Sequence, residues 1–254
     1  MSRIERVRAT LKKGGAVFIR AAEPDDVAAI RAFDAHMLVN NAFGVREPGE
    51  SERSEAEERT RIERFVREPG WLMLTAWTAN RHAELVGTLS FRNGDRRKLA
   101  HHGSFGVAVH GEWRGRGVGA AMIHSLLAWA VANRQIEKVS LGVFETNADA
   151  RRLYERLGFV EESRSPRHFK LGPGRYVDDV RMSLFVKPGV APQPFKTWPL
   201  PEPPKRQPKP PAPQAKPVPQ PAPPASVAAE RTTASSAQAP QPAPVSVPVP
   251  NPAS

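Results

Sequence analysis

The sequence predicts a mixed α+β domain, in which a sheet carries helices on both faces, followed by a tail without a core. Short apolar and β-branched runs alternate with segments of helical periodicity up to Lys187. Most of the 27 prolines follow Lys187, where too few apolar residues remain to offset the chain's conformational entropy. We therefore divide the 254 residues into a flexible basic leader over 1–15, a globular domain over 16–187 and a disordered Pro/Ala-rich tail over 188–254.

Each predicted element rests on a local pattern. Short apolar runs bounded by turn residues predict strands, and apolar residues three or four positions apart predict helices. Proline and acidic residues at 23–26 are typical of a helix start, and Asn147 is expected to cap a helix. The predicted elements are strands at 16–20, 71–78, 84–91, 105–109, 138–144, 160–169 and 176–186, and helices at 27–38, 52–67, 118–130 and 148–157.

The most informative segment is the strand, turn and helix from Ser104 to Ala121. Its turn is rich in glycine, which lets a backbone approach a ligand closely. Such a turn presents backbone N–H groups at the positive end of a helix dipole, and arginines add charge that suits phosphate oxygens. The segment therefore predicts a pyrophosphate site formed by Arg114, Gly115, Arg116, Gly117, Val118 and Gly119.

Three interpretations of this turn compete. It could be a glycine-rich surface loop, or a dinucleotide-binding fingerprint, since Gly115, Gly117 and Ala120 fit the loose spacing and Glu145 ends the next strand. A polar corner at 110–113 separates the strand from the glycines and argues against the fingerprint. In the third interpretation, residues 114–119 resemble the Arg/Gln-x-x-Gly-x-Gly/Ala segment of the GNAT family of N-acetyltransferases, which binds the pyrophosphate of acetyl-CoA.

A second segment, from Asn147 to Phe159, strengthens this resemblance. It is similar to the family's Asn-x-x-Ala-x-x-Leu-Tyr-x-x-x-Gly-Phe segment, and the two segments stand in the family's order and at its separation. The resemblance covers roughly residues 17–186 and implies a central, mostly antiparallel, twisted sheet of about seven strands. The end of the domain is similar to the branch of amino-acid, ribosomal-protein N-terminal and polyamine acetyltransferases, although Ser163 replaces a common glycine.

The resemblance implies direct acetyl transfer from acetyl-CoA to an amine in a ternary complex. In the family, a backbone N–H at the end of the central strand polarises the thioester carbonyl, a role that falls to Val109, or to Val107 if the register differs. Tyr154 occupies the general-acid position and would protonate the departing thiolate. Asn147 lies near the pantetheine arm in the family. The general base is unassigned among Glu145, Glu84, His102 and water.

The acceptor amine is the open part of the prediction. A pocket between the first helices and the terminal hairpin would include parts of 33–43 and 167–176. A free amino acid or small amine is favoured, and the alternatives are a polyamine, a protein N-terminus, or an acyl-CoA-binding regulatory or scaffold protein that uses the tail. Arg167 or Arg175 would suit an amino-acid carboxylate, whereas Glu161, Glu162, Asp178 and Asp179 would suit a polyamine.

Composition narrows the class of partner. The net charge is +11, but no aromatic-studded basic face marks a nucleic-acid surface, so part of the charge is attributed to coenzyme attraction. The chain has no cysteine, and His101-His102 lacks a third ligand at a supporting spacing, so no metal is expected. No apolar run approaches the length of a membrane span, and we expect a cytoplasmic protein with no membrane partner. A homodimer and a partner for the Pro-rich tail stay open.

Overall fold

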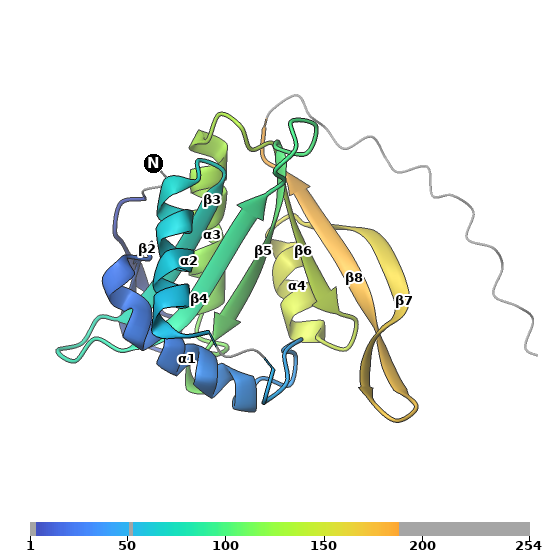
Figure 1. The fold of residues 1–254 in the computed structure, drawn as a ribbon, viewed down its shortest axis with the longest axis horizontal. Coiled ribbons are helices and arrows are strands. Elements are labelled where there is room, and N and C mark those ends of the chain that lie inside the picture. Colours follow the sequence, from blue (N-terminus) through green and yellow to red (C-terminus); the bar gives the residue numbers. More distant parts are fainter. Residues whose placement is uncertain (1–3, 51–52, 188–254) are drawn as a thin grey trace, which may run out of the picture. The chain divides into compact units, whose positions relative to one another are not determined.

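One mixed sheet runs through the domain, with its strands in the order β1-β2-β3-β4-β5-β6-β8-β7 (Figure 1). The computed structural model describes residues 4–50 and 53–187. The strands are β1 (Val7–Thr10), β2 (Ala16–Ala21), β3 (Trp71–Thr78), β4 (Leu85–Asn93), β5 (His102–Val109), β6 (Lys138–Phe144), β7 (Val160–Gly172) and β8 (Arg175–Phe185). The helices are α1 (Val27–Asn40), α2 (Glu55–Arg67), α3 (Val118–Ala132) and α4 (Ala148–Arg156), with short 3-10 turns η1 (Pro24–Asp26) and η2 (Gly111–Trp113).

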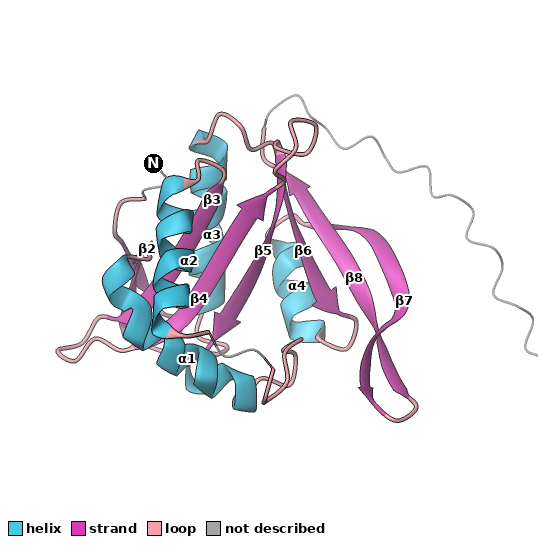
Figure 2. Ribbon diagram, in the orientation of Figure 1, coloured by secondary structure: helices cyan, strands magenta, loops and turns pink. Residues whose placement is uncertain are grey.

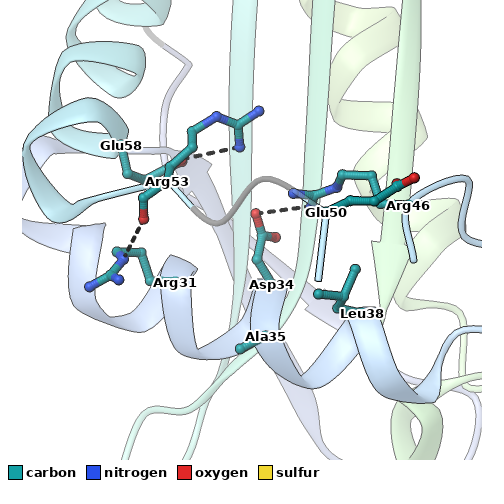
Figure 3. Close-up of a pocket in the computed structure, with 8 residues that line it drawn as sticks. All are labelled: Arg31, Asp34, Ala35, Leu38, Arg46, Glu50, Arg53 and Glu58. Carbon is teal, nitrogen blue, oxygen red and sulfur yellow. Dashed lines mark hydrogen bonds and ion pairs between the residues drawn. The ribbon is translucent and has the colours of Figure 1, made fainter. Parts of the chain in front are cut away.

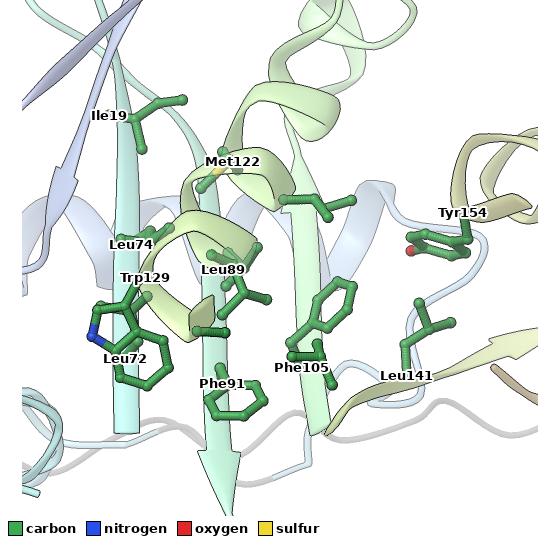
Figure 4. Close-up of a cluster of buried hydrophobic side chains, with 14 of the residues drawn as sticks. Ile19, Leu72, Leu74, Leu89, Phe91, Phe105, Met122, Trp129, Leu141 and Tyr154 are labelled. Atoms are coloured by element: carbon green, nitrogen blue, oxygen red, sulfur yellow. The ribbon is translucent and has the colours of Figure 1, made fainter. Parts of the chain in front are cut away.

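Helices cover both faces of the sheet, as the sequence predicts (Figure 2). The alternation of side chains along β3 shows how the layers form, because neighbouring residues of a strand point to opposite faces. Leu72 and Leu74 pack in the cluster that contains α3, whereas Met73 packs with α1 and α2. Figure 4 shows Met122 and Trp129 of α3 lying over the strands in the larger cluster.

The strand β1 is the main departure from the predicted elements. It pairs antiparallel with β2, with Val7 opposite Ile19, and brings the sheet to eight strands. The expectation of a flexible leader over 1–15 is wrong for its described part from residue 7 on, because β1 joins the sheet, Leu11 is buried in the core and the Lys12 backbone N–H donates to the Arg116 carbonyl at 3.0 Å. The predicted tail, 188–254, lies outside the described residues.

The parallel pair β5 and β6 positions the site. These strands pair at only three positions, from His102 opposite Lys138 to Ser104 opposite Ser140. Beyond Ser104 they diverge, and α4 packs behind the gap in the ribbon (Figure 1). All other neighbouring strands pair antiparallel, so the break occurs at the single parallel junction of the described sheet.

No helix within residues 4–50 and 53–187 is long and apolar enough to cross a membrane.

Candidate active site

A cleft with a volume of about 850 Å³ opens where β5 and β6 diverge. Its walls come from β5, the glycine-rich turn, β6, α4, the loop after α1 and the β7–β8 hairpin. All but one of the residues predicted to bind the cofactor line it. Those that do are Val107, Val109, Arg114, Gly115, Gly117, Val118, Gly119, Asn147 and Tyr154, and the exception is Arg116.

Two hydrogen bonds define which edge of β5 faces the cleft. The Gly94 N–H donates to the His102 carbonyl at 3.0 Å, and the His110 N–H donates to the Val86 carbonyl at 2.9 Å. These pairs extend the β4–β5 register by one residue at each end. Hydrogen-bonded and non-bonded pairs alternate along an antiparallel ladder, so the residues of β5 that bond to β4 between them are 104, 106 and 108.

The intervening residues of β5 direct their backbone N–H and C=O groups away from β4. For Val107 and Val109 this edge faces the cleft, because β6 pairs with β5 only up to Ser104. The Val109 carbonyl accepts a hydrogen bond from Arg114 Nε at 3.0 Å, whereas the two valine N–H groups have no strand partner in the sheet as described. The backbone N–H groups of both predicted valines can therefore donate to the carbonyl oxygen of a ligand in the cleft.

The turn between β5 and α3 offers a row of unpaired amides. Gly115 and Gly117 have φ of +68° and +102°, and Gly117 is the N-cap of α3 without a side-chain cap. The first hydrogen bond of the helix runs from the Ala121 N–H to the Gly117 carbonyl, and within the described structure no bond is made by the N–H groups of 115–120. Unpaired amides at a helix N-terminus bind anions, so the backbone geometry fits the predicted pyrophosphate site.

The two arginines of the turn have other contacts. Arg114 Nη2 donates to Asn41 Oδ1 at 3.3 Å, which links the end of β5 to the loop after α1. The Arg116 guanidinium lies over the Trp113 ring, 4.9 Å from its centroid. The side chain of Arg116 therefore packs on the Trp113 indole and does not line the cleft.

Lys12 reaches the same turn from the N-terminal hairpin, and sequence reasoning missed it. Lys12 lines the cleft, and its Cγ lies 3.9 Å from the position that a Cβ would take on Gly117. Lys12 therefore brings a positively charged residue to the part of the cleft that the glycine-rich turn borders. No motif marks this lysine, because it belongs to the segment interpreted as a leader.

Tyr154 lies on α4, whose N-terminus is capped by Asn147 Oδ1 accepting from the Ala150 N–H at 3.2 Å. Its ring packs edge-on against Phe105 and Phe159, with centroids 6.1 and 6.0 Å away. Only 7% of Tyr154 is exposed, and this burial raises its pKa to about 12. Its hydroxyl points from α4 toward β5 (Figure 4) and makes no hydrogen bond to any described residue.

None of the three side chains predicted as a general base lines the cleft. Glu145 Oε2 is 3.3 Å from Arg164 Nη1. His102 Nε2 lies 2.7 Å from Ser140 Oγ at the paired end of β5, where burial lowers the pKa of the imidazole. Glu84 is exposed beside the β3–β4 turn. His102 lies at the end of β5 remote from the cleft. Glu145 and Glu84 lie next to strand ends near the cleft, but their side chains do not line it.

The acceptor end of the cleft differs in detail from the prediction. Parts of both predicted segments line it, through Met37, Asn41, Phe43 and Phe169, and so does Asp179. The other charged residues proposed for the acceptor do not line the cleft: Arg167, Arg175, Glu161, Glu162 and Asp178. Arg181, which sequence reasoning did not single out, does.

A second, smaller pocket of about 80 Å³ lies between α1 and α2 and is lined mainly by charged side chains (Figure 3). Asp34 pairs with Arg46 at 3.6 Å, and Arg53 pairs with Glu58 at 3.4 Å. Burial raises the pKa of Asp34. These charges are matched within the pocket, and none of the predicted site residues lies there. The described residues contain no group of three His, Asp or Glu side chains that could hold a metal ion.

Comparison with known proteins places the chain in context. Residues 39–159 match the Acetyltransferase (GNAT) family. Over 168 residues the chain is 29% identical to the L-amino acid N-acetyltransferase AaaT of Escherichia coli. These residues are 66% of this chain and 96% of that protein.

Solved structures share the fold. One is an acetyltransferase of the GNAT family from Streptococcus pneumoniae, with a TM-score of 0.63 and 20% identity, covering 67% of this chain and 99% of that one. Another is a putative acetyltransferase from Salmonella typhimurium, solved with its cofactor acetyl-CoA, with a TM-score of 0.59 and 23% identity, covering 70% of this chain and 98% of that one.

Proposed function

We propose that this chain carries an acetyltransferase domain of the GNAT family, and that it moves the acetyl group of acetyl-CoA to the primary amine of a free amino acid or small amine. The transfer is direct, in a ternary complex. One observation carries the proposal: the unpaired amides of Val107 and Val109, the hydroxyl-bearing ring of Tyr154 and the N-terminus of α3 border one cleft.

Acetyl-CoA supplies an activated thioester, and the residues of this chain bind and polarise it. The amides of 115–120 hold the pyrophosphate, with Lys12 adding charge nearby. The N–H of Val107 or Val109 donates to the thioester oxygen as that oxygen becomes negative, and such fixed donors stabilise a transition state without reorganising.

Tyr154 gives its hydroxyl proton to the sulfur as the carbon–sulfur bond breaks. With a pKa of about 12 it stays protonated at neutral pH, so the donor form is always present. Burial disfavours charge on any acid, and a thiolate that departs into the same apolar surroundings also has a raised pKa. Burial therefore raises the pKa of the proton donor and that of the thiol together, and it does not by itself make the proton transfer less favourable.

The preference for an amino acid rests on two observations. The match to the L-amino acid N-acetyltransferase of Escherichia coli covers 96% of that protein. The acceptor end of the cleft carries both a carboxylate, Asp179, and a guanidinium, Arg181, which complement the two charges of an amino acid. A polyamine would be matched by carboxylates alone, and a protein N-terminus remains the alternative that needs a longer groove.

A panel of amines tests the proposal. The protein is incubated with acetyl-CoA and L-amino acids, polyamines or short peptides, and release of free CoA thiol is followed. Turnover is expected with amino acids and not with peptides, while Tyr154→Phe serves as the matched slow variant. Preferred turnover of a polyamine or a peptide would support those alternatives. Tight acetyl-CoA binding without turnover on any amine would support the non-enzymatic alternative, a regulatory or scaffold protein.

A further inference from the structure

A charged pair on β8 lies at the acceptor end of the cleft. Arg181 Nε forms an ion pair with Asp179 Oδ2 at 2.7 Å, and both residues line the cleft. The Asp179 side chain is 3% exposed and that of Arg181 is 49% exposed. Among the buried carboxylates of the described chain, Asp26 and Glu58 belong to η1 and α2, and only Asp179 borders the cleft.

The absence of a side chain at Gly142 makes room for this pair. The β6–β8 register places Gly142 opposite Arg181 and Phe144 opposite Asp179, so all four share one face of the sheet. A Cβ on Gly142 would lie 2.9 Å from Asp179 Oδ1 and 3.4 Å from Arg181 Cζ. The φ of Gly142 is not positive, so glycine is needed here for space and not for backbone conformation.

One oxygen of the buried carboxylate remains available. Asp179 Oδ2 is paired with Arg181, whereas Oδ1 has no hydrogen bond or ion pair to any residue within 4–50 and 53–187. Within the described residues, Asp179 forms an ion pair with Arg181, and the residues of β6 and β7 that line the cleft are uncharged. A buried carboxylate with a free oxygen in a ligand cleft is poised to receive a hydrogen-bond donor.

Aromatic rings line the cleft on the side of Asp179, whose side chain is buried. Phe144 packs against Phe169 with centroids 4.5 Å apart and against Phe43 at 6.4 Å, and all three rings line the cleft. A less polar environment strengthens the attraction between opposite charges. The acceptor end thus offers an anion, a cation and an apolar wall, which match the ammonium, the carboxylate and the side chain of an apolar amino acid.

We infer that Asp179 and Arg181 bind the acceptor amino acid, with Arg181 on its carboxylate and Asp179 Oδ1 on its ammonium, and that Asp179 takes the first ammonium proton. This inference rests on the proposed function and names residues for it. It also replaces Glu145, Glu84 and His102 as the base, since those side chains do not line the cleft.

The proton balance of the step is complete. The ammonium gives one proton to Asp179, and the nitrogen lone pair then forms the carbon–nitrogen bond as the carbon–sulfur bond breaks. Tyr154 protonates the thiolate, and the second proton that the nitrogen must lose restores the Tyr154 hydroxyl through water, so the amide nitrogen keeps one hydrogen. Asp179 releases its proton to solvent, so one proton leaves for each acetyl group transferred.

The first experiment removes the charge of Asp179 and keeps its shape. Asp179→Asn is expected to lower kcat/KM for the amino acid by about 10²–10⁴-fold, the usual loss with a general base, and to abolish the acidic limb of the pH profile. The thermal shift given by acetyl-CoA should stay at the wild-type size. Glu145→Gln, the same chemical change outside the cleft, is the matched control and should keep the wild-type profile.

The second experiment separates the two partners by substrate. The most active amino acid of the panel is compared with the amine that lacks only its carboxylate, such as 3-methylbutylamine for leucine. Arg181→Gln should raise KM for the amino acid about tenfold or more and leave KM for the amine unchanged, because a charge-assisted hydrogen bond is lost only with the former. Equal effects on both substrates would overturn the role of Arg181.

A third variant tests the site without removing a polar group, and its thermal shift with acetyl-CoA shows whether the protein is folded. Gly142→Ala places a methyl group against Asp179 Oδ1 without removing any polar atom, so it should impair amine turnover while acetyl-CoA still raises the melting temperature. If the wild type acetylates no amine, the proposed function fails. If the wild type is active and folded Asp179→Asn retains turnover within a few-fold, or Glu145→Gln loses the acidic limb instead, the inference about Asp179 is overturned.

Discussion

The hydroxyl of Tyr154 contributes to proposed chemistry, whereas its ring contributes to packing, and one substitution separates the two. Tyr154→Phe keeps the contacts with Phe105 and Phe159. The variant is expected to lose about 10²–10⁴-fold in kcat, because the departing thiolate lacks its proton donor, while the Kd for acetyl-CoA changes little. Steady-state kinetics and coenzyme titration measure both. A near-wild-type kcat, with chemistry shown to limit turnover, would remove Tyr154 from the mechanism.

The raised pKa of Tyr154 also predicts a dependence of stability on pH. An ordinary tyrosine has a pKa of 10.0, and burial raises that of Tyr154 to about 12 in the folded protein. The folded state therefore holds the hydroxyl proton more tightly than the unfolded state does. The resulting gain in the free energy of unfolding is complete below pH 10 and is lost as pH rises toward 12. Two pKa units correspond to about 3 kcal/mol. Urea unfolding across this range should show a steeper fall in free energy for wild type than for Tyr154→Phe, and parallel curves would contradict the assignment.

The sequence predicts the role of a residue that belongs to a motif. It does not predict which of two neighbouring strand residues faces the cleft. Asn147 and Gly117 occur at the motif positions and take up the expected cap and turn. Asp178 and Asp179 are adjacent, and the sequence does not distinguish them. In the structure Asp178 Oδ1 accepts from the Arg167 N–H, while Asp179 borders the cleft, because neighbouring side chains of a strand point to opposite faces.

At the scale of elements, the turn before α3 makes the sharpest prediction. Gly117 has a φ of +102°, a left-handed conformation that a β-branched residue adopts only under strain. Gly117→Val is therefore expected to distort the row of amides and to abolish the rise in melting temperature that acetyl-CoA produces. The matched control is Gly119→Ala, whose Cβ would meet Val109 Cγ2 at an ordinary 3.7 Å. An unchanged shift in folded Gly117→Val would exclude the turn as the pyrophosphate site.

Local patterns predicted most elements because most of them bury a regular face. Strand β6 spans the predicted residues, and α3 begins at the predicted Val118. Strand β1 escaped prediction because it is a short, largely exposed edge strand whose pairing with β2 is a tertiary effect. The divergence of β5 from β6 was equally hidden, since nothing within either strand indicates where their pairing stops.

At the scale of the whole domain, Lys187, the last described residue after β8, contacts the end of α3. Its Nζ donates to the carbonyls of Val131 at 2.5 Å and of Asn133 at 2.9 Å, near the negative end of the helix. A chain truncated after Lys187 is expected to unfold with the midpoint and cooperativity of the full chain. Lys187→Ala in that truncated chain should cost about 1 kcal/mol, since a cation at a helix C-terminus is lost. Loss of cooperative urea unfolding on truncation alone would place the domain boundary further along the chain.

The open edge of β5 has a consequence for hydrogen exchange in the free protein. The amide protons of 106 and 108 are bonded to β4, whereas those of Val107 and Val109 face the cleft. Exchange should therefore alternate residue by residue, slow at 106 and 108 and fast at the two valines. Saturating acetyl-CoA should slow exchange at the valines and leave their neighbours as they were, which residue-resolved NMR can follow. Uniform protection before the coenzyme is added would mean that this edge is already closed, and the alternation would vanish with it.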